Sequence, residues 1–153
     1  MTEHPDFRGL DDVGTVGVVG AGTMGNGIAQ VSATAGYDVV MRDVQESFVA
    51  DGLDAVDDSL SRLVRKGTLT EDEAAAARDR VTGTTELDDL AAADLVVEAA
   101  PEEMELKRDV FADLDAATDG DVVLATNTST LSVTTIAAAT ERAPLVLGLH
   151  FVN

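Results

Sequence analysis

Short apolar runs alternate along the chain with longer stretches in which apolar residues recur every three or four positions. Runs of four to eight apolar or β-branched residues, bounded by glycine or polar residues, are typical of buried parallel strands. We expect a weaker strand at VTGTTEL (81–87) and buried strands at TVGVVG (15–20), YDVVMRD (37–43), DLVVEAA (94–100), DVVLATN (121–127) and PLVLGLHF (144–151).

The stretches between these runs have the period of amphipathic helices. Gly36 and Gly67 stand where helices should end, and Thr70 is a good N-cap for the helix that it precedes. The predicted helices cover 24–35, 45–66, 70–81, 102–117 and 133–139. Their apolar stripes, which should face the core, are Met24, Ile28, Val31 and Ala35; Phe48, Leu53, Val56, Leu60, Leu63 and Val64; and Leu106, Val110, Phe111 and Leu114.

Strands that alternate with helices predict a parallel, doubly wound α/β sheet. Parallel neighbours need long crossover connections, and the helices of those connections cover both faces of the sheet. The helices at 45–66 and 70–81 follow one another after the second strand, so we expect a helical hairpin inserted there. Residues 1–12 form a polar lead, and residues 13–153 have the length of one ordinary domain.

The charge balance is strongly acidic. The 29 aspartate and glutamate residues against 10 lysine and arginine residues give a formal net charge of −19. Such a surface repels polyanions, so we expect no nucleic acid as a partner. It is typical of proteins that stay soluble in concentrated salt, where the screening length of about 3 Å at 1 M removes self-repulsion. We therefore expect a halophilic, cytoplasmic protein.

The composition also narrows the available chemistry. The chain has no cysteine and only two histidines, far apart, so we expect no disulfide, cysteine nucleophile or metal site. The start MTEHPDFRGLDD is unlike a signal peptide, and no apolar stretch approaches the roughly 18 residues of a membrane span. We expect no membrane partner, and any catalysis would use oxygen, imidazole or a bound cofactor.

A glycine-rich motif follows the first predicted strand. VVGAGTMG matches G-x-G-x-x-G between a strand and a helix. The first glycine permits the tight turn, the second leaves room for a pyrophosphate, and the third lets the helix pack closely, with its free N–H groups facing the phosphates. The motif predicts a Rossmann-type dinucleotide site that includes Gly20, Ala21, Gly22, Thr23, Met24 and Gly25.

Asp43 ends the second predicted strand, 23 residues after Gly20. A carboxylate at this place accepts hydrogen bonds from the adenosine ribose hydroxyls and repels a 2′-phosphate. The sequence therefore predicts NAD rather than NADP as the cofactor, and Arg42 is the one neighbour that could soften this preference.

Three further motifs, VVEAAPEEMELK, ATNTSTLS and GLHFVN, follow predicted strands. Open α/β sheets bind ligands at the carboxyl ends of their strands, so these segments should line one crevice. Together with VGVVGAGTMGNGIAQ they resemble the NAD-binding domain of the 3-hydroxyacyl-CoA dehydrogenases of fatty-acid β-oxidation, whose patterns read much like G-A-G-x-M-G-x-G-I-A, V-E-A-x-x-E, S-N-T-S-S-L and G-x-H-F-x-N-P. The resemblance covers nearly the whole chain from Thr15.

The resemblance implies roles for individual residues. His150 would be the catalytic base, and Ser129 would hydrogen-bond the reacting oxygen of the substrate. An imidazole suits this role because oxidation of an alcohol needs a proton acceptor that titrates near neutral pH. The resemblance places Glu102, Lys107, Asn127, Ser129 and Asn153 on the nicotinamide side of NAD, and Ser59, Lys66 and Ser129 against the coenzyme A of an acyl-CoA substrate.

Two charged residues have structural explanations as well. Lys66 stands at the end of a predicted helix, where an ammonium interacts favourably with the helix dipole. Glu98 lies near the end of the fourth predicted strand, and we expect it to be structural, as a cap of the next helix.

The sequence departs from the family pattern after GLHFVN. In the family a proline follows, then a glutamate about a dozen residues beyond the histidine orients it, and a helical domain closes the substrate cleft and usually forms the dimer. We expect this C-terminal helical domain to be absent or supplied by a separate chain. The protein would then be a truncated chain, half of a split gene, or a domain that only binds.

Two other functions are compatible with these motifs. The chain could be a non-catalytic NAD(H)-binding module. It could also be a fragment of a 3-hydroxyisobutyrate-type dehydrogenase, although such enzymes use a lysine on a later helix, and the motifs NTST and HFVN argue against them. The main hypothesis is the NAD-binding half of an (S)-3-hydroxyacyl-CoA dehydrogenase that is poorly active alone.

Overall fold

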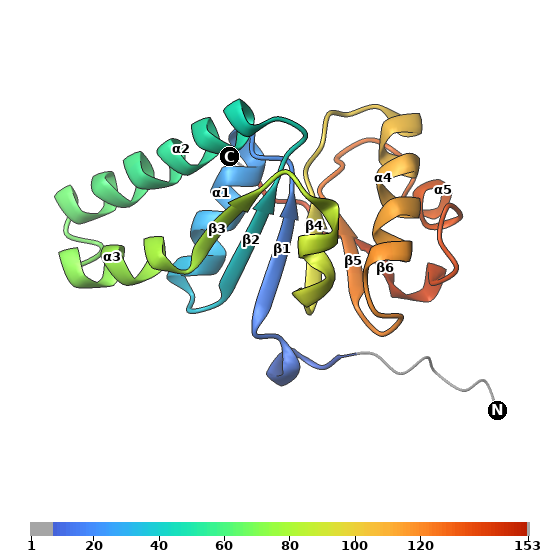
Figure 1. The fold of residues 1–153 in the computed structure, drawn as a ribbon, viewed down its shortest axis with the longest axis horizontal. Coiled ribbons are helices and arrows are strands. Elements are labelled where there is room, and N and C mark those ends of the chain that lie inside the picture. Colours follow the sequence, from blue (N-terminus) through green and yellow to red (C-terminus); the bar gives the residue numbers. More distant parts are fainter. Residues whose placement is uncertain (1–7, 153) are drawn as a thin grey trace.

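A computed structural model describes residues 8–152, which contain one six-stranded sheet (Figure 1). The strands are β1 (Thr15–Val19), β2 (Asp38–Arg42), β3 (Val81–Thr84), β4 (Leu95–Glu98), β5 (Val123–Thr126) and β6 (Val146–Gly148). Their order is β3-β2-β1-β4-β5-β6, and every neighbouring pair is parallel. The predicted doubly wound sheet is confirmed, and its order reverses between β1 and β4.

Helices cover both faces of this sheet. They are α1 (Thr23–Thr34), α2 (Glu46–Arg65), α3 (Glu71–Asp79), α4 (Met104–Ala117) and α5 (Val133–Ala137), with the 3₁₀ helices η1 (Leu10–Asp12), η2 (Leu87–Ala92) and η3 (Ala143–Leu145). Helices α1, α2 and α3 pack on one face, and η2, α4 and α5 on the other. Figure 1 shows α2 and α3 side by side as the predicted hairpin, beyond the β3 edge of the sheet.

Successive strand residues alternate between two apolar cores. Val18 belongs to the core that contains Ile28 of α1 and Val56 of α2. Val19 belongs to the opposite core, which contains Phe111 of α4. Both faces of the central strands are therefore buried, which explains why they read as continuous apolar runs.

The apolar stripe predicted for α1 is partly wrong. Ile28 is buried, but Val31 is 52% exposed, and Ala35 is an exposed residue that follows the helix. The face that packs on the sheet has smaller residues and includes Ala29 and Ala33. Small side chains let α1 approach the strands closely, so the most hydrophobic stripe of this helix is not the buried one.

The run at 144–151 forms a strand, but the expectation that this strand is buried is wrong. Strand β6 lies at the edge of the described sheet and pairs with β5. Leu147 is 43% exposed, and Leu149, just after the strand, is 37% exposed. Burial of an edge strand depends on what covers its free side, which the pattern of the strand itself does not reveal.

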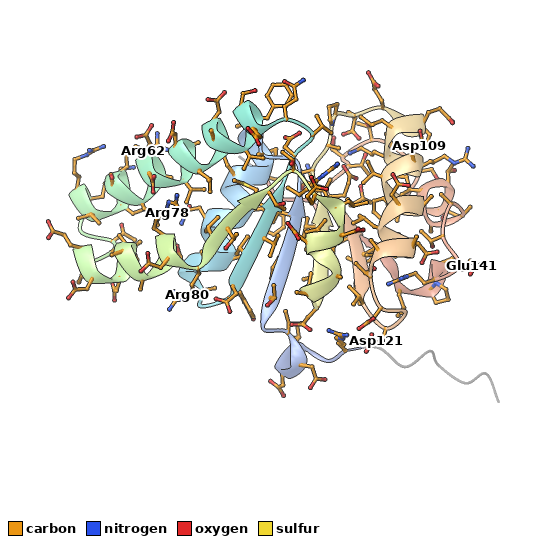
Figure 2. All side chains as sticks on the ribbon, viewed as in Figure 1. Arg62, Arg78, Arg80, Asp109, Asp121 and Glu141 are labelled. Carbon is orange, nitrogen blue, oxygen red and sulfur yellow. The ribbon has the colours of Figure 1, made fainter. Side chains whose placement is uncertain are left out.

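The α2–α3 hairpin has the predicted turn and cap. Gly67 has a φ of +75°, a left-handed conformation that favours glycine. Thr70 Oγ1 accepts the N–H of Glu73 at 3.1 Å, and the Glu73 carboxylate accepts the N–H of Thr70 at 2.9 Å. Figure 2 shows Arg78 of α3 directed toward α2, where its Nε contacts Asp57 at 2.6 Å.

Carboxylates are spread over the outer surface. Asp109 on α4 and Glu141 after α5 both point outward in Figure 2. Acidic residues outnumber basic ones by 29 to 10 in the sequence, and adaptation to salt stays a prediction from this excess. No helix within residues 8–152 is long and apolar enough to span a bilayer.

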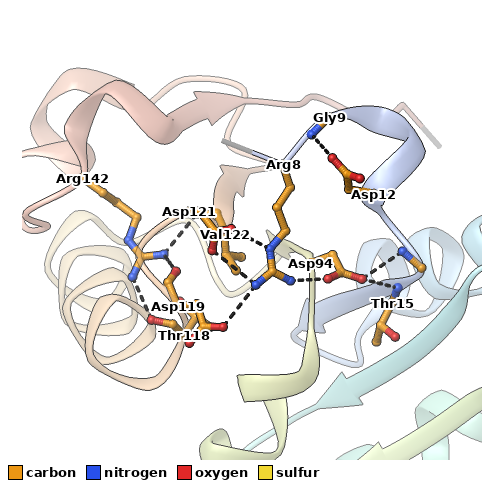
Figure 3. Close-up of polar contacts among 11 residues, drawn as sticks. Arg8, Gly9, Asp12, Thr15, Asp94, Thr118, Asp119, Asp121, Val122 and Arg142 are labelled. Carbon is orange, nitrogen blue, oxygen red and sulfur yellow. Dashed lines mark hydrogen bonds and ion pairs between the residues drawn. The ribbon is translucent and has the colours of Figure 1, made fainter. Parts of the chain in front are cut away.

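Arg8 connects the start of the described chain to the amino ends of the strands (Figure 3). Its guanidinium donates to the carboxylate of Asp94, which precedes β4. It also donates to both carboxylate oxygens of Asp121, which precedes β5, at 3.0 and 3.2 Å. Asp94 also accepts the N–H groups of Gly14 and Thr15, both at 2.9 Å. One cluster therefore links β1, β4 and β5 at the end of the sheet opposite the glycine loop.

These contacts lower the pKa values of two carboxyl groups. Partial burial raises the pKa of Asp94, but hydrogen bonds from the N–H groups of Gly14 and Thr15, and from Arg8, outweigh it. The hydrogen bond from Arg8 lowers the pKa of Asp121. A carboxyl group with a lowered pKa in the folded state stabilises the fold above its unfolded pKa, and the contribution disappears as pH falls through the folded value.

Arg8→Met should therefore lower the melting temperature at neutral pH. The difference from the wild type should shrink as pH falls below about 4, where aspartate in the unfolded chain becomes protonated, and should close below the lowered pKa values of the folded chain. Thermal melts followed by circular dichroism, with Arg62→Met on the exposed side of α2 as the control, measure this difference. A difference that persists unchanged in acid would show that Arg8 stabilises the fold by packing and not through these carboxylates.

Candidate functional site

A cavity of about 680 Å³ opens at the carboxyl ends of β1, β2 and β4. The glycine loop forms one wall, the end of β2 and the first turn of α2 form the second, and the loop after β4 with the start of α4 forms the third. This is the place where the strand order reverses, and ligands of open α/β sheets bind there. Six residues predicted for the cofactor line the cavity: Gly20, Ala21, Gly22, Thr23, Met24 and Asp43.

Each glycine of the motif has its own geometric reason. Gly20 has a φ of +103°, so the tight turn favours glycine. A Cβ on Gly25 would lie 1.6 Å from the carbonyl oxygen of Gly20, so only glycine lets α1 pack here. A Cβ on Gly22 would meet nothing within 4 Å, and α1 begins at the next residue. The free N–H groups of the helix thus lie beside open space that fits a pyrophosphate.

Asp43 has two roles at the end of β2. Its Oδ2 accepts the N–H of Ala21 at 2.8 Å and its Oδ1 accepts the N–H of Val44 at 2.7 Å, so the carboxylate braces the glycine loop. It also lines the cavity, where a negative charge suits an unphosphorylated ribose. Arg42 lines the cavity as well, and its Nε is held by the carbonyl of Thr85 at 3.1 Å.

Apolar side chains form the remaining walls. The expectation that Phe48 and Leu106 belong to the core is wrong, because they are 45% and 36% exposed and line the cavity. Both lie in the first turn of their helices, α2 and α4, where those helices begin at the edge of the cavity. With Val44 and Val110 they provide apolar surface that suits an aromatic base such as adenine.

The end of β4 holds a buried ion pair. Glu98 is 0% exposed and Lys107 is 2% exposed, and Lys107 Nζ donates to Glu98 Oε2 at 2.6 Å. The expectation that Glu98 caps the next helix is wrong, since α4 has Glu103 at its N-cap and no side-chain cap. Lys107 lies against Glu98 and does not line the cavity, and two of its three N–H donors are committed to Glu98 and to the carbonyl of Ala100.

Glu102 connects the loop after β4 with the loop after β5. Its Oε1 accepts the hydroxyl of Thr128 at 2.5 Å, and its Oε2 lies 3.5 Å from the N–H of Ser129. Thr128 Oγ1 also accepts the N–H of Leu131 at 3.0 Å. The side chains of Glu102 and Ser129 are exposed, and neither lines the cavity beside the glycine loop.

Asn127 connects the loop after β5 with the segment that carries His150. Its Oδ1 accepts the N–H of Phe151 at 2.7 Å, and its own N–H donates to the carbonyl of Glu98 at 2.8 Å. The side chain of His150 is exposed. Asn153, the last residue predicted for the cofactor, lies outside the described residues. The segments that follow β4, β5 and β6 are therefore hydrogen-bonded to one another at the carboxyl end of the sheet.

Two of the three residues predicted for coenzyme A, Ser59 and Lys66, lie elsewhere, on α2. Ser59 Oγ donates to Gln30 Oε1 at 3.3 Å, where α2 packs on α1. Lys66 is exposed at the C-cap of α2, about 27 Å along the helix axis from Phe48.

Sequence reasoning missed the polar groups that link the loops. Thr126 and Thr128 are buried, and their hydroxyls bond Glu98 and Glu102. The signal for Glu98 was present: an ionisable residue in an apolar strand needs an opposite charge, and the chain has only two lysines, Lys66 and Lys107.

Comparison with known proteins agrees with this geometry. Residues 15–153 match the family model described as "3-hydroxyacyl-CoA dehydrogenase, NAD binding domain". The chain is 44% identical over 138 residues to a 3-hydroxybutyryl-CoA dehydrogenase of Bradyrhizobium diazoefficiens, and 46% identical over 144 residues to one of Mycobacterium tuberculosis. These alignments cover 90% and 94% of this chain but 47% and 50% of the relatives.

A crystal structure of (S)-3-hydroxybutyryl-CoA dehydrogenase from Ralstonia eutropha superimposes with a TM-score of 0.90 at 47% identity. It covers 92% of this chain and 50% of that one, so the chain spans about half the length of the relatives it matches. The fold, the glycine loop and the family match agree on NAD as the cofactor. The chain belongs to the NAD-binding domain family of the 3-hydroxyacyl-CoA dehydrogenases.

Proposed function

We propose that this chain is the cofactor half of an NAD-dependent (S)-3-hydroxyacyl-CoA dehydrogenase, which interconverts a 3-hydroxyacyl-CoA and the corresponding 3-oxoacyl-CoA. One observation carries the proposal: the dinucleotide cradle of the glycine loop and the loop that bears His150 lie at the same edge of one parallel sheet. Relatives between 44% and 47% identical, named as 3-hydroxybutyryl-CoA dehydrogenases, support it.

In this proposal NAD lies across the carboxyl ends of β1 and β4. The first N–H groups of α1 hold the pyrophosphate, and Asp43 accepts the hydroxyls of the adenosine ribose. When bound, the nicotinamide would supply hydride exchange with the substrate carbon. The nicotinamide side is built by Glu102, Lys107, Asn127, Ser129 and Asn153; the first four lie in or directly after the loops that follow β4 and β5.

His150 is the proposed catalytic base. Its imidazole takes the hydroxyl proton as hydride leaves the same carbon, and Ser129 hydrogen-bonds the reacting oxygen. The exposure of both side chains at the ends of the neighbouring strands β5 and β6 supports these roles.

The substrate and partners follow from the relatives and are part of the proposal. An acyl-CoA is proposed as the substrate, with Ser59 and Lys66 near its coenzyme A, and fatty-acid β-oxidation in the cytoplasm as the setting. One relative, 38% identical over 142 residues, is named as the alpha subunit of a fatty acid oxidation complex of Pseudomonas putida. Since the matched relatives are about twice as long, a helical second half is proposed to complete the site.

A second candidate is a module that binds NAD(H) without turnover. It is favoured by the lining of the cavity, which includes the glycine loop and Asp43 but neither Ser129 nor His150. Turnover in the presence of the second half separates the two candidates.

Wild-type chain should bind NADH at least about tenfold more tightly than NADPH, a difference of about 1.4 kcal/mol. Asp43→Asn should reduce this preference, because it removes the charge that opposes a 2′-phosphate while keeping an oxygen for the N–H of Ala21. Calorimetric titration in molar salt measures both affinities, with the exposed Asp54→Asn on α2 as a charge-matched control. Equal or tighter binding of NADPH by the wild type would overturn the assignment of Asp43.

Turnover of acetoacetyl-CoA with NADH should be slight for the chain alone and should appear when the helical half of a relative is added. In the completed enzyme His150→Ala should lose about 10² to 10⁴ of the rate, the typical contribution of a positioned base. NADH affinity should change by less than about twofold, since the base contributes to the chemical step.

His4→Ala, which removes the other histidine of the sequence, is the matched control. Full activity of the completed His150→Ala enzyme would contradict the assigned base. Absence of turnover under all conditions, with NADH binding intact, would favour the binding module.

A further inference from the structure

Burial of the ion pair formed by Glu98 and Lys107 costs more desolvation free energy than a contact between apolar side chains would. Two charges that are 0% and 2% exposed have lost their hydration, and such a pair is often no more stable than apolar residues of similar volume. A buried pair that is worth little to stability suggests another use. The pair lies between the end of β4 and the loop that lines the cavity, and this place suggests a role in the cofactor site.

Glu98 occupies the centre of the strand ends. The register places it beside Val19 of β1 and Thr126 of β5. Its Oε1 accepts the hydroxyl of Thr126 at 2.7 Å, and its Oε2 accepts the N–H of Ala100 at 2.7 Å and Lys107 Nζ at 2.6 Å. Both carboxylate oxygens are therefore committed to groups of three different segments.

Lys107 completes the hold on the same loop. Its Nζ donates to the carbonyl of Ala100 at 2.9 Å, so both peptide groups of Ala100 are bound, one by each member of the pair. Ala99, Ala100 and Pro101 line the cavity. An ammonium has three N–H donors. With two of them committed, the carboxylate of Glu102 lies next, at 3.9 Å from Nζ.

We propose that Glu98 is a positioning residue for the nicotinamide half of the cofactor. It fixes Lys107 so that the remaining N–H, together with the exposed carboxylate of Glu102, faces the ribose next to the nicotinamide. The inference rests on the proposed function, because it takes the nicotinamide side to lie at the loops after β4 and β5. The adenosine half depends on the glycine loop and Asp43, so Glu98 should not affect it.

A comparison of NADH with ADP tests this division. ADP carries the adenosine and pyrophosphate alone, whereas NADH adds the nicotinamide and its ribose. Wild-type chain should bind NADH more tightly than ADP. Glu98→Gln should weaken NADH about tenfold or more, the effect of one hydrogen bond to a charged group, and change ADP by less than about twofold.

Two further variants separate positioning from direct contact. Lys107→Met should weaken NADH in the same way, and adding Glu98→Gln to Lys107→Met should cause no further loss, because Glu98 acts through Lys107. Glu105→Gln, an 83% exposed carboxylate paired with Arg108 on the same helix, is the control and should change neither affinity. Circular dichroism melts establish that each variant is folded.

The single Glu98→Gln variant leaves a buried ammonium without its partner and could fail to fold. In that case the double variant, which removes both charges, decides alone: loss of the NADH advantage over ADP supports the inference, and its retention overturns it. A parallel loss of NADH and ADP would also overturn it, since that is the result of a general structural defect. A wild-type chain that binds neither ligand would overturn the proposed function itself, and this inference with it.

Discussion

A carboxylate and an ammonium buried together at the end of β4 determine much of the surrounding structure. Removing two charges from water costs several kcal/mol per ion unless each is paired and fully hydrogen-bonded. The sheet register supplies Thr126 to Glu98, and α4 packs so that Lys107 reaches the strand end. The loop at Ala100 is then held by both of its peptide groups. This half of the site is fixed by polar satisfaction, before any ligand binds.

The other half is fixed by close packing. The carbonyl of Gly20 leaves no room for a Cβ on Gly25, and the Asp43 carboxylate braces the loop between them through the N–H of Ala21. A steric cradle suits a pyrophosphate, which needs N–H groups and space. A polar network suits the nicotinamide side, where hydride transfer needs the reacting atoms held in a near-attack geometry. In the proposed binding mode, the two ends of one dinucleotide would thus be held by different physical means.

The sequence predicted what depends on local pattern. The alternation of strands and helices, the glycine loop, Asp43 and the capped hairpin at Thr70 follow from short-range periodicity and turn chemistry, and the structure has them as expected. The burial of β6 was predicted wrongly because an edge depends on neighbours. The stripe on α1 was partly wrong, because Ala29 and Ala33, and not Val31, are buried with Ile28. The partner of Glu98 was missed because it lies nine residues away on a helix that only the fold brings to the strand end.

Hydrogen exchange of the cofactor-free chain tests most directly whether the nicotinamide side is preset by the fold. The amides of Ala100 and Phe151 are hydrogen-bonded to side chains, Glu98 and Asn127, and not within a helix or strand. If the network forms without a ligand, both amides of the cofactor-free chain should exchange about a hundredfold or more slowly than free peptide groups. The reason is that protection from exchange reports the free energy of local opening. Exchange near the free-peptide rate that slows only when NADH is added would contradict the account, because the ligand and not the buried pair would then assemble this side of the site.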